Sequence, residues 1–126
     1  MKKFVCLAVI AALLPLSAGA EMIRFSRCTV NPGQTLASVQ GVFKDWRELF
    51  EKEGFGDHAI RLLVPHAGSE TADDTFWIEF TSPNFTRYGM AWEWWYTDPD
   101  AAAASVSMEE VFKCETAELF RSIFSM

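Results

Sequence analysis

The sequence predicts an α+β fold in which one antiparallel β-sheet carries helices on one of its faces. Apolar residues recur every three or four positions over 36–50, as in an amphipathic helix. Apolar and other residues alternate over 75–81, as in a half-buried strand. Cys28 and Cys114 lie near the two ends of the same region, where a first and a last strand are expected.

Residues 1–20 have the features of a cleavable signal peptide. Lys2 and Lys3 precede an apolar run over 4–16, and 18–20 reads Ala-Gly-Ala, a small-x-small cleavage pattern. The run is shorter than the roughly 20 residues that span a bilayer. We therefore expect one domain over 21–126, located in the periplasm or outside the cell and not attached to a membrane after cleavage. The alternative is an N-terminal buried helix.

The net charge limits the classes of binding partner expected for the exported domain, and the cysteine count predicts a disulfide. Loss of Lys2 and Lys3 leaves nine basic residues against 17 acidic ones, a net charge of −8. This balance disfavours nucleic acid and anionic membranes, which require clustered Lys and Arg. Cys6 leaves with the signal, and we expect Cys28 and Cys114 to form a disulfide in an oxidising compartment. A redox pair or two buried thiols are the alternatives.

The first strand is expected over 22–30, because the Asn-Pro-Gly at 31–33 is a turn signal. Thr35 can cap the helix that follows, and Gly54 can end it. One face of this helix is apolar, and polar residues fill the other. The apolar set is Leu36, Val39, Val42, Phe43, Trp46, Leu49 and Phe50.

The second strand is predicted over 58–64 and ends before Pro65. The third covers 75–81, with Phe76, Ile78 and Phe80 on one face.

Ser82 and Pro83 have the residue types of an N-cap and a first helical position, so we expect a helix from Phe85 to about Tyr96. The alanines of 101–104 suggest a short further helix. Residues 111–124 are apolar enough for a last strand, with a possible bulge at 114–116.

The order strand–helix–strand–strand–helix–strand is that of the ferredoxin-like fold. Its usual strand order, 4-1-3-2, makes the first and last strands neighbours. Cys28 and Cys114 can then meet across one ladder.

The sheet face away from the helices is predicted to carry an unusual mixture of side chains. By alternation these are Arg24, Ser26, Arg61, Leu63, Trp77, Glu79 and Thr81. The mixture is too apolar for a solvent face, so we expect a homodimer that packs two such faces around a pocket. A small ligand would stack on Trp77, with Arg61 and Glu79 orienting its polar end. The alternative is a monomer whose last segment covers the sheet.

The second helix has one aromatic residue outside its predicted core arc. That arc comprises Phe85, Tyr88, Trp92, Trp95 and Tyr96. Trp94 points the opposite way, beside Met90, and large apolar groups so placed typically mark an interface. Packing under the alanine-rich segment is the alternative.

Candidate metal and catalytic residues are few. His58 and His66 would lie roughly 26 Å apart on one strand, at about 3.3 Å per residue, so they cannot share a metal, and no metal site is predicted. Either histidine could singly ligate a haem, and His66, near the end of a strand, is the better placed. His66 is also a candidate ligand-binding residue. No nucleophile elbow, phosphate loop or calcium loop is present, so no catalytic residue is assigned.

Over most of 22–124 the chain resembles the dimeric α+β barrel superfamily, on the element order and the aromatic second helix. That group includes antibiotic-biosynthesis-type monooxygenases, EthD-like proteins and haem-handling relatives. The chain is also similar to small exported bacterial proteins of unknown function with a cysteine near each end. The resemblance implies a dimer and the possibility of oxidative chemistry.

These observations support three functional hypotheses. The first is an exported homodimer, without assigned catalysis, that binds a small, partly apolar ligand between its sheets. The second is a monooxygenase-like or haem-handling enzyme, with haem as the one cofactor considered. The third is a partner-binding module that uses Trp94 and Met90.

Overall fold

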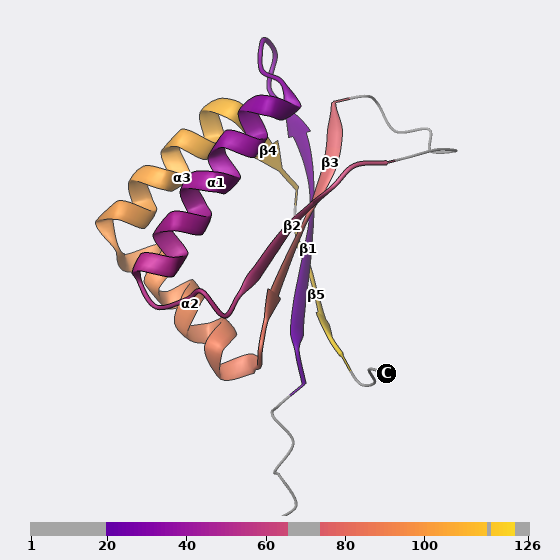
Figure 1. Ribbon diagram of the computed structural model, residues 1–126. Helices are drawn as coiled ribbons and strands as arrows, with labels where there is room; N and C mark the ends of the chain where they lie inside the picture. The colour runs from indigo at the N-terminus through magenta and orange to yellow at the C-terminus, as the bar shows by residue number, and fades with distance from the viewer. Residues whose placement is uncertain (1–19, 66–73, 116, 123–126) are drawn as a thin grey trace, which may run out of the picture.

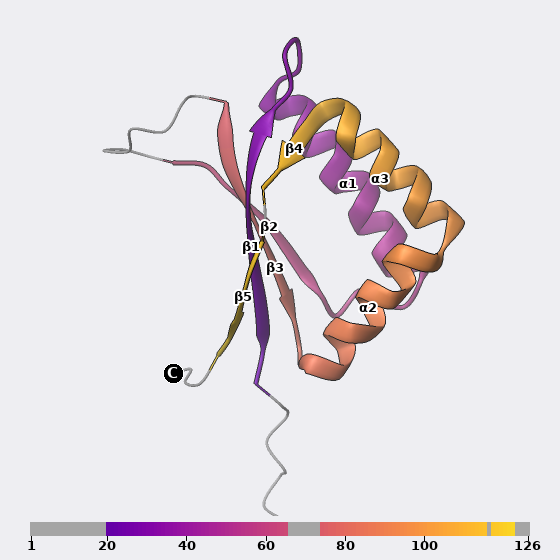
Figure 2. The same ribbon diagram turned by 180° about the vertical axis from the view of Figure 1, so that it is seen from behind.

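The computed structural model describes residues 20–65, 74–115 and 117–122, so 1–19, 66–73, 116 and 123–126 lie outside the description. All three helices cover the same face of one antiparallel sheet, and no element of the described chain covers the other face (Figures 1 and 2). The strands are β1 (Met22–Val30), β2 (Ala59–Leu63), β3 (Thr75–Ser82), β4 (Phe112–Cys114) and β5 (Glu118–Arg121). The helices are α1 (Leu36–Lys52), α2 (Phe85–Thr97) and α3 (Pro99–Val111).

The strand order is β2-β3-β1-β4, and β5 also pairs with β1. This is the ferredoxin-like order, so the predicted fold class is confirmed. The predicted last strand over 111–124 differs in detail. Val111 belongs to α3, and the rest forms two short strands that follow the same edge of β1, one opposite Cys28–Val30 and one opposite Met22–Phe25.

Helix α1 begins and ends where its local sequence favours it. The Thr35 hydroxyl accepts a hydrogen bond from the Ser38 amide, and the Ser38 side chain accepts one from the Thr35 amide, a reciprocal cap. Glu53 is the C-cap, and Gly54 follows with φ of +82°, a conformation that glycine adopts without steric cost. Trp46 and other apolar residues of α1 are buried toward the sheet.

The start of α2 differs from the prediction. Ser82 is the last residue of β3, where it pairs with Met22 and is fully buried. Asn84 is the N-cap instead, and its side chain accepts a 2.9 Å hydrogen bond from the Arg87 amide. Pairing in the sheet therefore outweighs the local preference of Ser82 for an N-cap position.

Helix α3 is longer than the short alanine-rich helix that the sequence predicts. The Asp98 side chain accepts hydrogen bonds from the amides of Asp100 and Ala101, and Pro99 occupies the first turn. Asp98 thus ends α2 and starts a 13-residue helix, which lies beside α1 over the sheet (Figures 1 and 2).

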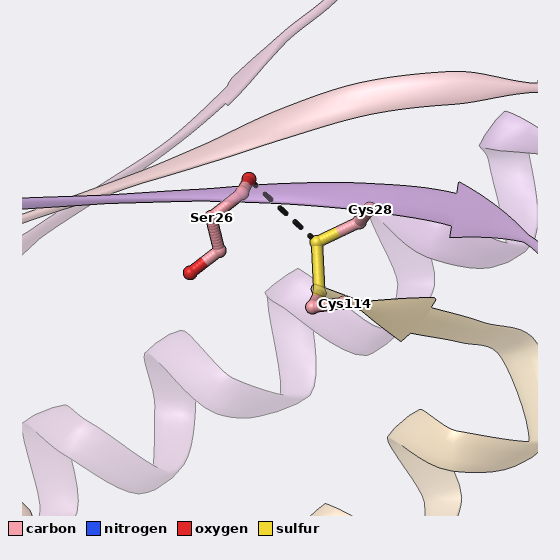
Figure 3. Close-up of a disulfide and its surroundings, with 3 residues drawn as sticks. All are labelled: Ser26, Cys28 and Cys114. Atoms are coloured by element: carbon pink, nitrogen blue, oxygen red, sulfur yellow. Dashed lines mark hydrogen bonds between the residues drawn. A yellow bond between two sulfur atoms is a disulfide. The ribbon is translucent and has the colours of Figure 1, made fainter. Parts of the chain in front are cut away.

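The predicted disulfide joins β1, inside the sheet, to the edge strand β4. Cys28 and Cys114 are directly paired in the β1–β4 ladder, with an S–S distance of 1.99 Å and 4.0 Å between their Cα atoms. Figure 3 shows the disulfide and the Ser26 side chain on the same side of β1. Cys28 and Phe112 belong to the main apolar core, which also includes Phe76 and Trp46.

Within the described ranges, no helix is long and apolar enough to cross a membrane. The predicted signal peptide lies outside these ranges except for Ala20, which is exposed.

Candidate ligand cavity

A cavity of about 490 Å³ lies between the sheet and the helices. Every helix and the four strands β1–β4 contribute to its wall, which is mainly aromatic and aliphatic. The lining residues are Arg24, Ser26, Trp46, Phe50, Ile60, Ile78, Phe80, Ala91, Trp92, Trp95, Tyr96, Ala102, Ser105, Met108, Glu109 and Cys114. Its volume falls in the range of small-molecule sites, roughly 300–1,000 Å³.

Arg24 and Ser26 lie on the helix-facing side of β1, so their predicted place on the open face is wrong. Arg24 is directly opposite Phe80, and Ser26 is opposite Ile78. Residues directly opposite each other in a ladder share a face. Cys28 stands on that face as well, two positions beyond Ser26, and it belongs to the core. The even positions of β1 therefore face the helices.

The guanidinium carbon of Arg24 lies 4.0 Å from the centroid of the Trp92 ring. This is a close cation–π contact on the cavity wall. In the part of the chain that the structure describes, no carboxylate lies within ion-pairing distance of Arg24. Among the described residues, the partner of this half-buried cation is therefore an aromatic face.

Other polar groups in the wall are few. The Ser105 hydroxyl donates to the Ala101 carbonyl, whereas the Ser26 hydroxyl has no partner among the described residues. The indole nitrogens of Trp46 and Trp92 are buried without an acceptor in the same part of the chain. These two nitrogens have almost no accessible surface, so they add little to the polar groups that a bound molecule could reach.

Three of the predicted ligand-binding residues, Arg61, Trp77 and Glu79, lie on the opposite, open face of the sheet. The Arg61 guanidinium donates to the Glu79 carboxylate, which also accepts a 3.3 Å hydrogen bond from Thr81. Trp77 lines a groove on this face. The guanidinium carbon of Arg27 lies 5.7 Å from the centroid of the Trp77 ring.

The groove on the open face is apolar. It is lined by Phe25, Leu63, Val64, Pro65, Trp77, Glu118 and Phe120. Phe25 and Phe120 meet edge to face with their ring centroids 5.6 Å apart. Arg61, Glu79 and Trp77 thus share one surface, as predicted, but this surface is separated by the sheet from the cavity that contains Arg24.

The arrangement of α2 corrects the predicted aromatic arc. Trp94, expected to be exposed, packs with its ring centroid 5.1 Å from Phe50 and 5.2 Å from Phe55. Phe55 comes from the loop after α1 and belongs to the same buried cluster as Phe50 and Phe80. Phe85 and Tyr96, expected in the core, are 68% and 76% exposed.

Met90 remains exposed, as the interface hypothesis requires. Trp94 is partly buried against Phe50 and Phe55, so it offers less surface to a partner than the sequence predicts.

An ionic cluster joins the loop after α1 to the start of α2. Arg87 donates to both carboxylate oxygens of Asp57, at 2.7 and 2.9 Å, and to the Gly54 carbonyl at 2.7 Å. The hydrogen bond from Arg87 is the main reason that the pKa of Asp57 lies below its ordinary value of 3.8. The same bond raises the pKa of Arg87.

His58 has a structural place in this cluster. Its Nδ1 lies 3.0 Å from Asp57 and 3.1 Å from the Phe55 carbonyl, and its Nε2 lies 3.3 Å from the Arg87 carbonyl. The ring is fully buried and stacks on Phe80. Both ring nitrogens already face protein acceptors, so His58 does not fit the role of a haem ligand.

His66, the other candidate haem ligand, lies outside the described residues. Among the described residues, no group of three or more His, Cys, Asp or Glu side chains could hold a metal ion.

Sequence reasoning missed the residues of the helix-facing cavity, Arg24 and Ser26. Alternation places Arg24 and Ser26 on the same face of β1 as Cys28. It does not show which face the helices cover, and only the packed structure places Cys28 in the core beneath them.

Comparisons of the sequence with protein-family models and with curated proteins give no match. Solved structures do match in three dimensions. The cofactor-independent oxygenase SnoaB from Streptomyces nogalater has 13% identity and a TM-score of 0.57, over 86% of this chain and 98% of that one. A mutant of SnoaB gives 15% and 0.63 over the same shares.

A protein of unknown function from Bacteroides thetaiotaomicron, described as a possible oxidoreductase, has 17% identity and a TM-score of 0.57. The match covers 83% of this chain and 100% of that one. At these identities the similarity concerns the fold. The chain therefore has a ferredoxin-like α+β fold and shares its overall architecture with SnoaB and the Bacteroides protein.

Proposed function

We propose that the protein binds a small aromatic ligand in the cavity between the sheet and the helices. The observation that carries this proposal is the contact of Arg24 with Trp92 inside a cavity whose other walls are largely apolar. Ligand sites typically combine such walls with a few polar groups that fix orientation. The proposal moves the ligand from the predicted inter-sheet pocket to the other side of the sheet.

Native mass spectrometry of protein purified from the periplasm tests this proposal. We expect an additional non-covalent mass on the wild-type chain. Ala102→Trp should reduce its occupancy at least tenfold, because Ala102 lines the cavity and an indole there would fill it. Ala103→Trp is the matched control, since Ala103 is the exposed next residue of α3 and does not line the cavity.

Circular dichroism should show the same fold for both variants. An adduct that survives Ala102→Trp unchanged would place the bound molecule elsewhere and reject the cavity.

We also propose that two copies pair through the open sheet faces. The described part of this face has partly exposed apolar side chains in Leu63, Val64 and Phe120, which are 38%, 51% and 46% exposed. Arg61, Trp77 and Glu79 would lie in this interface. Exposed apolar patches of this kind favour self-association.

The same spectra test the dimer. Phe120→Asp should give a monomer, whereas Val106→Asp, on the exposed surface of α3, should leave the protein dimeric. A monomeric wild type would reject the dimer. An adduct that is lost with Trp77→Ala but kept with Ala102→Trp would support the inter-sheet pocket instead.

A second candidate function is oxygenation without a cofactor, the activity named for SnoaB. The specific observation in its favour is Arg24, because a guanidinium beside an aromatic ligand stabilises the deprotonated form of a phenol, the form that reacts most readily with oxygen. An oxygen electrode with a dihydroxynaphthalene as the probe tests it. Uptake above the buffer rate that falls with Ala102→Trp would support the activity, and uptake equal to buffer would reject it.

Export to an oxidising compartment remains part of the proposal. The Cys28–Cys114 disulfide supports it, because such bonds persist mainly outside the reducing cytosol.

A further inference from the structure

Arg24 differs from the other arginines that the structure describes in its partners. Arg47, Arg61 and Arg87 each pair with a carboxylate. Arg27, which lies over Trp77, and Arg121, the last residue of β5, are both exposed, so water can solvate them. Arg24 is half-buried beside Trp92 and has no carboxylate partner among the described residues.

The absence of an acidic partner at Arg24 is not explained by the composition of the protein. The chain has 17 acidic residues against 11 basic ones, so carboxylates are abundant. Glu109 also lines the cavity, yet it does not lie within ion-pairing distance of Arg24. A buried or half-buried cation is normally compensated by a negative group. A ligand that brings this group would complete the site.

The contact with Trp92 leaves the hydrogen-bonding edge of Arg24 available. A guanidinium stacked on a ring uses its π-face, whereas its N–H donors lie in its own plane. Those donors match the two oxygens of a carboxylate. The Ser26 hydroxyl lines the same cavity two positions along β1 and has no partner among the described residues, so it provides a further donor.

We infer that the ligand of this cavity is an aromatic carboxylate, whose carboxylate binds Arg24 and whose ring packs against the tryptophan wall. This inference rests on the proposed ligand-binding function and specifies the chemical class of the ligand.

The test compares two probes of the same shape, 2-naphthoate and its neutral amide, 2-naphthamide. Their binding to the mature, disulfide-bonded protein is measured by titration calorimetry near pH 7. We expect 2-naphthoate to bind at least tenfold more tightly. Arg24→Met, which keeps an apolar stem without the charge, should reduce this preference to nearly one.

Arg27→Met is the matched control, because Arg27 belongs to the same strand and also contacts a tryptophan, but on the opposite face. It should leave the preference unchanged. Raising the salt concentration with the wild type gives a check that needs no variant: binding of 2-naphthoate should weaken more than binding of 2-naphthamide.

The possible failures are distinguishable. Equal binding of both probes to the wild type would overturn the carboxylate inference and leave the cavity as a ligand site. A preference that persists in Arg24→Met, or that salt does not reduce, would also overturn it. If neither probe binds the wild type, the aromatic-ligand function itself is rejected.

Discussion

At the scale of single residues, β1 shows how strongly a function depends on which face a side chain occupies. Ile23 and Phe25 are at odd positions of this strand, and Met22, Cys28 and Val30 are at even ones, so both faces have apolar residues. The even positions face the helices, which puts Arg24 into the cavity instead of the open face. A shift of one position in this assignment exchanges every side chain between the two surfaces.

Trp94 gives a prediction at this scale. Trp94→Ser should lower the free energy of unfolding by about 3 kcal/mol, because it removes an indole packed between Phe50 and Phe55. Phe85→Ser, on the same helix but 68% exposed, should change it by less than about 0.5 kcal/mol. Urea denaturation measures both, and equal effects would contradict the burial of Trp94.

At the scale of elements, the loop after α1 is tied to the start of α2. The Asp57–Arg87 pair, the bond from Arg87 to Gly54 and the buried ring of His58 connect these segments. The loop also brings Phe55 over Trp94. The position of α2, and with it the cavity wall formed by Trp92 and Trp95, depends on this connection.

The pH dependence of stability tests the Asp57–Arg87 ion pair that connects this loop to α2. Because the pKa of Asp57 is lowered in the folded protein, its contribution is present above its ordinary value of 3.8 and is lost as the pH falls through the lowered value. Asp57→Asn should therefore destabilise the protein at pH 7, by no more than about 1 kcal/mol, since the side chain is 44% exposed and solvent screens the pair.

The difference between Asp57→Asn and the wild type should shrink as the pH falls below the ordinary value of 3.8. Glu51→Gln is the control. It removes the carboxylate partner of Arg47 in an ion pair whose side chains are 79% and 55% exposed, so it should have little effect at any pH. A constant difference between Asp57→Asn and the wild type across the acid range would contradict the assigned cause.

At the scale of the whole molecule, β1 organises the fold. It pairs with β3 along one edge and with β4 and β5 along the other. The cavity lies on one side of this strand, and the proposed dimer face lies on the other. Ligand binding and dimerisation are therefore separable by variants on opposite faces of a single strand.

The disulfide contributes at this scale, because it closes a chain segment of 86 residues. A closed loop of that length restricts the unfolded chain by about 4–5 kcal/mol in the entropic account. Replacing Cys28 and Cys114 together by alanine should lower the free energy of unfolding by several kcal/mol. Urea denaturation of the wild type with and without a reductant checks this, and identical midpoints would contradict it.

The sequence by itself determined the features that depend on near neighbours along the chain. The periodicity of 36–50, the alternation of 75–81 and the capping residues Thr35 and Gly54 act over a few positions, and the order of the resulting elements indicates the ferredoxin-like fold. The paired cysteines also followed from the sequence, because that order makes their strands adjacent.

Tertiary structure decided which surfaces these elements share. Alternation separates Arg24 from Phe25, but only the packing of α1, α2 and α3 shows which of them faces the helices. Trp94 is covered by Phe55, which comes from a loop 39 positions earlier in the sequence, so the helical period of α2 alone could not show its burial. The cavity likewise requires side chains from three helices and four strands, and its existence depends on contacts that no local pattern encodes.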